Sequence, residues 1–181
     1  HSFPTRRSSD LITYMEMRPH DPRAPLEMAE MLTGFPNRLA EAEEYALRAL
    51  ELAPLNGACW LALAAVEAAL GNTSQALDRY SRTIAEHEEF ANEARLRMAA
   101  ILYTGGELSQ AREVLLPAAS SGEAGAYRLL TLVYLDQNDR LRARDSAQRY
   151  LFIEPGGNWA DSAQLILQGL SPEYYPHTPE E

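Results

Sequence analysis

Residues 57–90 read GACWLALAAVEAALGNTSQALDRYSRTIAEHEEF, and this stretch decides the fold. Small and apolar residues recur in it every three or four positions, first up to Leu70 and again from Ala76 to Ile84. That is the period of a helix with one buried face. Gly71 and Asn72 separate the two runs and are typical of a helix end. Because neither helix can bury its apolar face alone, the stretch predicts two antiparallel helices that also pack against further helices.

The same pattern recurs along the chain at a nearly constant interval. One column of alanines has spacings of 34, 35 and 32 residues, and two further columns keep these spacings. The three columns are Ala42, Ala76, Ala111 and Ala143; Ala46, Tyr80, Leu115 and Ala147; and Ala49, Thr83, Ala118 and Tyr150. Helical hairpins that stack at a fixed repeat length form a solenoid. The sequence therefore predicts an all-α fold, an α-solenoid of antiparallel helix pairs with a C-terminal capping helix.

The residues of this stretch resemble the signature of the tetratricopeptide repeat (TPR) family. The matching residues are Trp60, Leu63, Ala64, Gly71, Ala76 and Tyr80. The resemblance implies a stack of helical hairpins that binds a protein or peptide and does not catalyse a reaction. The alternative is an ordinary helical bundle with coincidental spacing.

The columns divide the chain into repeats. We expect four repeats, at residues 23–56, 57–91, 92–123 and 124–155, preceded by the remnant of another repeat at 12–22 and followed by a capping helix at 156–170 and an extended tail at 171–181. Pro117 falls inside the second helix of the third repeat, where a proline costs about 3 kcal/mol. We therefore expect that repeat to be irregular, with its second helix kinked or ended near Leu116.

Residues 1–11, HSFPTRRSSDL, do not follow the repeat pattern. They resemble one translated frame of a widely used sequencing-library adapter. We therefore expect this segment to be foreign to the fold and disordered, and we expect the native N-terminus to be missing. The competing interpretations are a basic, serine-rich targeting segment and a natural disordered tail.

Composition narrows the classes of partner. The chain has 181 residues and a formal net charge of −10, and all its 16 cationic side chains are arginines. An acidic chain without basic clusters argues against a nucleic-acid partner, since phosphate contacts need clustered cations. No apolar run approaches the roughly 18 residues that a membrane span requires. Localisation stays open, with the cytoplasm as the default and the periplasm as the alternative.

The sequence predicts no catalytic, metal or cofactor site. His20, His87 and His177 have no spacing that converges on a metal. Cys59 is the only cysteine, and we interpret it as a small core residue. The glutamates within residues 86–89 are too close in sequence to face one another on a helix, so they do not predict paired catalytic carboxylates.

The resemblance also implies candidate binding residues, because the first helices of such repeats line a concave groove that holds a peptide. The candidates are Leu61, Ala65 and Ala68 in the second repeat, Leu96, Ala100 and Tyr103 in the third, and Arg128, Leu132 and Leu135 in the fourth. This surface is small and apolar, so we expect a partner that presents an apolar helix or strand. In the alternative, the alanines pack a tightly wound superhelix and no groove opens.

Three hypotheses for function follow from these observations. The first is a non-catalytic scaffold that holds a protein or peptide of unknown identity in the groove. The second is an accessory region of a larger enzyme, such as a glycosyltransferase, and the third is an exported bacterial envelope assembly factor. Upstream coding sequence would separate the three. The oligomeric state is not predicted.

Overall fold

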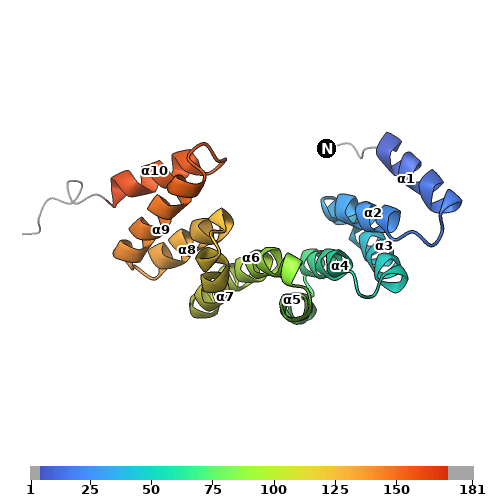
Figure 1. Cartoon of the computed structure of the whole chain (residues 1–181), viewed down its shortest axis with the longest axis horizontal. Helices are drawn as coiled ribbons and strands as arrows, with labels where there is room; N and C mark the ends of the chain where they lie inside the picture. The colour runs from blue at the N-terminus through green and yellow to red at the C-terminus, as the bar shows by residue number, and fades with distance from the viewer. Residues whose placement is uncertain (1–4, 171–181) are drawn as a thin grey trace, which may run out of the picture. The chain divides into compact units, whose positions relative to one another are not determined.

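The computed structural model describes residues 5–170, which are helical apart from short turns (Figure 1). Contacts divide the chain into two compact units, residues 1–98 and 99–181, with the boundary inside one helix. The helices are α1 (Thr5–Met17), α2 (Arg23–Thr33), α3 (Leu39–Leu52), α4 (Gly57–Ala69), α5 (Thr73–Glu86), α6 (Glu88–Thr104), α7 (Leu108–Ser120), α8 (Ala124–Asp136), α9 (Arg140–Ile153) and α10 (Ala160–Gly169), with a 3-10 helix at Pro36–Arg38. The all-α fold of packed helix pairs is therefore confirmed.

The first unit contains α1 to α5 and the first part of α6. Its pairs are α2 with α3 and α4 with α5, and helices α1 to α4 share one core. Leu32, Leu63 and Val66 are fully buried in that core beside the alanines Ala42 and Ala46. Since a methyl side chain lets two helices approach closely, the alanine columns set the spacing of the hairpins.

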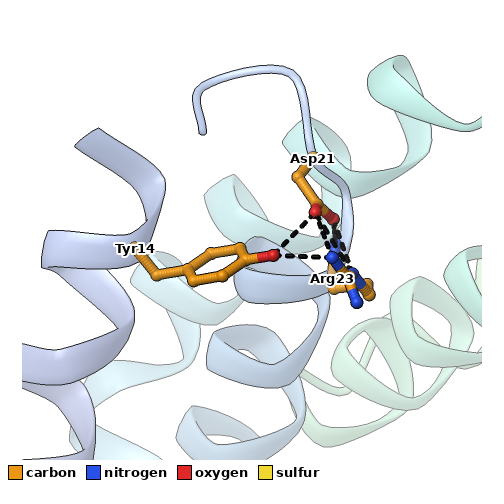
Figure 2. A network of polar contacts seen from close by, with 3 residues as sticks. All are labelled: Tyr14, Asp21 and Arg23. Carbon is orange, nitrogen blue, oxygen red and sulfur yellow. Dashed lines mark hydrogen bonds and ion pairs between the residues drawn. The ribbon is translucent and has the colours of Figure 1, made fainter. Parts of the chain in front are cut away.

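Helix α1 is joined to α2 by a polar network in the connecting turn. Figure 2 shows the phenol of Tyr14 pointing toward Asp21 and Arg23. The Tyr14 hydroxyl donates to Asp21 Oδ2 at 2.8 Å and accepts from Arg23 Nη2 at 2.6 Å. The Arg23 guanidinium and backbone N–H both donate to Asp21, and these bonds hold the pKa of its carboxyl well below the usual range. The network links a residue of α1 to the first residue of α2.

The second unit contains the end of α6 and α7 to α10. Helices α8 and α9 form a pair, and α10 packs on α9 through the buried Ala160 and Ala163. The Tyr150 hydroxyl accepts from the Trp159 backbone N–H at 3.2 Å, and their rings meet edge to face at 5.0 Å. This contact positions the start of α10, the helix expected from the sequence to cap the array.

Residues 5–11 differ from the sequence expectation. They form the first turns of α1 and are not disordered. Ser8, Leu11 and Met15 lie three and four residues apart, so they share one helical face, and all three are buried. Arg7 also forms an ion pair with Glu27 on α2. The helical period of residues 12–17 therefore continues upstream. The tail expected at residues 171–181 lies outside the described residues.

At Pro117 one of the two expected outcomes, the end of the helix, is wrong. Helix α7 does not end near Leu116 but continues to Ser120. Proline removes the bond that the Glu113 carbonyl would otherwise receive. Glu113 and Pro117 are both exposed, so water can reach that carbonyl, while Leu115 and Ala118 pack on the opposite face. The helix tolerates this proline because the lost bond faces solvent.

Candidate protein-binding groove

A groove of about 600 Å³ lies on the first unit, between three helices that alternate along the chain. Helices α2, α4 and α6 each contribute side chains to its lining. The lining consists of Glu30, Thr33 and Gly34 from α2 and its end, Ala58, Leu61, Ala62 and Ala65 from α4, and Phe90, Glu93 and Arg97 from α6. The groove therefore belongs to the helix layer in which the sequence predicted a binding surface.

Helix α4 forms the floor of the groove. Its lining residues Ala58, Leu61, Ala62 and Ala65 are three and four positions apart, which places them on one face. The side chain of Asn56 accepts the Ala58 N–H at 3.0 Å and caps the start of this helix. Because three of the four floor residues carry only a methyl group, the main chain of a bound segment could come close to the helix.

The charged residues stand on α2 and α6. Arg97 Nη2 donates to Glu93 Oε1 at 2.6 Å, one turn away on the same helix. Despite desolvation, bonds to Glu93 and the nearby Tyr80 hydroxyl raise the pKa of Arg97. Glu30 faces this pair from α2. Desolvation raises the pKa of the Glu30 carboxyl, and the charge of Arg97 offsets this only in part.

Two of the nine candidate residues, Leu61 and Ala65, line this groove. Ala68 lies further along α4, and Leu96 lies on α6; both are half-buried outside the lining. The candidates on α4 therefore coincide in part with the lining of this groove, and the candidate on α6 does not; the binding role of all four stays a prediction.

The other five candidates lie in the second unit. Ala100, Leu132 and Leu135 are half-buried and Arg128 is exposed. Tyr103 lies beside Asp136 at the end of α8, and hydrogen bonding to that carboxylate raises the pKa of the phenol. The structure does not place these five residues in the groove of the first unit, and their role stays a prediction.

The sequence analysis missed Glu30 and Phe90 of the lining for two different reasons. It placed no groove position in the first repeat, so Glu30 and its neighbours on α2 were left out. It also began the third repeat at residue 92, whereas α6 begins at Glu88 and carries Phe90 into the groove. The period of α4 could have found Ala58 and Ala62, which lie one turn from Leu61 and Ala65.

Two further findings concern residues 5–170. No group of three or more His, Cys, Asp or Glu side chains is placed to hold a metal ion in that range. Within the same residues, no helix has both the length and the apolar character needed to cross a membrane.

Comparison with known proteins identifies the fold. No protein-family model matches the sequence, and no curated protein matches it. Among solved structures, similarity is found to a chain of the APC/C hetero-tetramer Cut9-Hcn1, with a TM-score of 0.72 and 19% identity over 90% of this chain and 31% of that chain. A tetratricopeptide repeat protein from Parabacteroides merdae gives a TM-score of 0.69 and 18% identity over 90% and 62%.

A third similar structure is pilF of Pseudomonas aeruginosa, with a TM-score of 0.71 and 18% identity over 82% of this chain and 67% of that chain. This chain therefore spans about a third of the Cut9-Hcn1 chain and about two thirds of the other two. At these identities the likeness establishes the fold alone. The fold is the TPR type of α-solenoid that the sequence columns predict.

Proposed function

We propose that this chain is a non-catalytic scaffold that holds a peptide or protein segment in the groove between α2, α4 and α6. The observation that carries this proposal is the groove itself, whose volume of about 600 Å³ lies in the range of ligand-binding sites. Its alanine floor suits an extended or helical segment, because small side chains leave room for a partner's main chain. In this proposal, the groove is part of the concave face of the solenoid.

The similar structures support a protein partner. The structure that includes Cut9 is a hetero-tetramer with Hcn1, so one chain of this fold works within a protein assembly. Nothing in the groove favours the two other hypotheses, the accessory region of an enzyme and the envelope assembly factor, over a free-standing scaffold. Both are compatible with the same binding surface.

Filling the groove with uncharged side chains tests the proposal. A display library of random heptapeptides is selected on the purified chain, and the enriched peptides are measured on Ala58→Met and Ala65→Met. Both alanines are half-buried and line the floor, so the longer side chains should occupy the groove and weaken binding at least about tenfold, or about 1.4 kcal/mol. Equal affinity of the enriched peptides for the filled variants, or no enrichment, would overturn the proposal.

Ala69→Met is the matched control. Ala69 is exposed at the end of the same helix and does not line the groove. The control adds the same side chain to α4, so it should leave the affinities unchanged. Far-UV circular dichroism on all three variants checks that helicity is kept.

A further inference from the structure

The charged residues of the groove define the kind of segment it fits, an inference that rests on the function proposed above. Three of its lining residues are ionisable: two glutamates and one arginine. Arg97 is bonded through both Nε and Nη2 to Glu93, at 3.1 and 2.6 Å. That pair neutralises itself and leaves the carboxylate of Glu30 as the remaining charge of the lining.

Glu30 has no such bonded partner. Within residues 5–170 its carboxylate accepts no hydrogen bond, and the charge of Arg97 reaches it only as a longer-range attraction. Glu30 is exposed to solvent and also lines the groove, and partial desolvation there is the main reason that its pKa is raised. A cation brought by a partner would take the place of water beside this carboxylate.

The groove floor beside Glu30 limits which side chains a bound segment can carry next to its cationic residue. Gly34, Ala58, Ala62 and Ala65 offer no long side chain to meet an incoming segment, and Leu61 and Phe90 supply apolar contact. Small or apolar side chains can lie against this floor with the main chain close to α4. The combination is a shallow apolar surface with one carboxylate on its α2 side.

We infer that the groove binds an extended segment in which one lysine or arginine pairs with Glu30 while small, apolar neighbours lie over the alanine floor. An acidic segment or a free C-terminal carboxylate fits less well, because it would meet Glu30 and Glu93 with the only cation of the lining already paired. The formal net charge of −10 adds a long-range attraction for cationic segments.

Three synthetic peptides test this inference on the full chain. Each is an acetylated, amidated and fluorescein-labelled heptapeptide of alanine, serine and leucine, with lysine, glutamine or glutamate at the centre. Two interaxial spacings of packed helices span about 16–20 Å, and seven extended residues span about 23 Å, so the peptide covers the groove. Fluorescence anisotropy should show the lysine peptide binding about three to ten times more tightly than the glutamine peptide, and the glutamate peptide binding least.

Glu30→Gln should remove the preference for lysine over glutamine, and Glu30→Lys should reverse it in favour of glutamate. Glu44→Gln is the matched control, because it makes the same change in net charge at an exposed position of α3 outside the groove lining. The control should keep the full preference. If both glutamine variants lower the preference equally, the net charge of the chain attracts the lysine and the inference is overturned.

The remaining outcomes separate this inference from the proposed function. If all three peptides bind equally and Ala65→Met weakens them all, the groove binds segments without a preference for a cation, and only this inference fails. If Ala65→Met changes none of the affinities, the groove is not the site and both proposals fail. Absence of binding by every peptide at about 1 mM would also overturn the inference.

Discussion

The α4–α5 hairpin and the α8–α9 hairpin have the same backbone plan but different interiors. Their helices have 13 and 14 residues in both cases. Each first helix is followed by a residue with positive φ, Gly71 at 83° and Asn138 at 57°. Ala76 and Ala143 are both fully buried at the equivalent positions of the second helices. Helix length, turn and alanine column are therefore common to the two hairpins.

The side chains between the helices differ. In α4–α5, Arg79 Nε donates to both carboxylate oxygens of the buried Glu67 at 2.7 Å. The equivalent positions of α8–α9 hold Tyr134 and Ser146, which are also buried. One interior is closed by an ion pair and the other by an aromatic ring with a small polar side chain.

The buried tyrosine also occupies different positions in the two second helices, α5 and α9. Tyr80 and Thr83 of α5 correspond to Ala147 and Tyr150 of α9, and all four are buried. The tyrosine moves by one turn, and the small residue takes the other position. The comparison teaches that the hairpin needs its interior filled, and that the chemistry of the filling can vary.

The largest effect is expected from Arg79→Ala. The variant leaves the Glu67 carboxylate, whose side chain is 4% exposed, without its cation. Stranding a buried charge should lower the free energy of unfolding by about 3 kcal/mol. Ser146→Ala, at the equivalent position of α9, should cost less than about 1 kcal/mol. Urea denaturation followed by far-UV circular dichroism measures both.

Transplanting the second interior into the first hairpin sharpens this comparison. The double variant Glu67→Tyr, Arg79→Ser removes both charges and introduces the pair found in α8–α9. Replacing a buried ion pair by residues of suitable volume is often close to neutral, so the double variant should unfold within about 1 kcal/mol of the wild type. A double variant as unstable as Arg79→Ala would show that the interiors are not interchangeable.

The next largest effect is expected from exchanging glycine and alanine at the first residues of α4 and α8. A methyl group on Gly57 would lie 2.5 Å from Phe90 Cδ2 and 2.8 Å from His87 Cβ. Gly57→Ala should therefore destabilise the first unit by about 1–3 kcal/mol, although alanine is ordinarily the better helix former. The equivalent Ala124 already has its methyl group, and Ala124→Gly should cost about 0.5–1 kcal/mol.

The midpoint of thermal unfolding, measured by circular dichroism, checks this pair of variants. A Gly57→Ala protein that melts above the wild type would contradict the packing between α4 and the turn that precedes α6. It would also show that helix propensity outweighs the close contact at this position.

The repeat columns allowed the fold to be predicted, because spacing alone decides which residues of a helix are buried. Ala42, Ala76, Ala111 and Ala143 are each fully buried. The same columns place Leu115 and Ala118 on the buried face of α7, so the exposed position of Pro117 could have been predicted as well. The continuation of the helix to Ser120 was missed because the cost of a proline was taken from an average helix interior and not from an exposed face.

The groove was predicted in part. Leu61 and Ala65 follow from the period of one helix, and both line it. Glu30 and Arg97 come from two other helices, 67 positions apart in sequence. Their approach depends on how three hairpins stack, which a repeat signature does not encode. A resemblance to a family therefore locates a surface more readily than it identifies the charges on it.

The smallest effect is expected at the turn residues. The two hairpins have the same left-handed conformation there but use different residues, Gly71 and Asn138. No atom of a neighbouring residue lies within 4 Å of the position that a Cβ on Gly71 would take, so Gly71→Ala causes no clash. It should lower the free energy of unfolding by about 1 kcal/mol, because alanine is strained in the left-handed conformation of this residue. Asparagine tolerates this conformation better than alanine, so Gly71→Asn should cost less. The reciprocal Asn138→Gly should change the unfolding free energy by no more than about 0.5 kcal/mol. Urea denaturation of the three variants gives the order of their unfolding free energies. If Gly71→Ala proves as stable as Gly71→Asn, the turn can relax out of the left-handed region. Gly71 and Asn138 would then not have equivalent roles in the two hairpins.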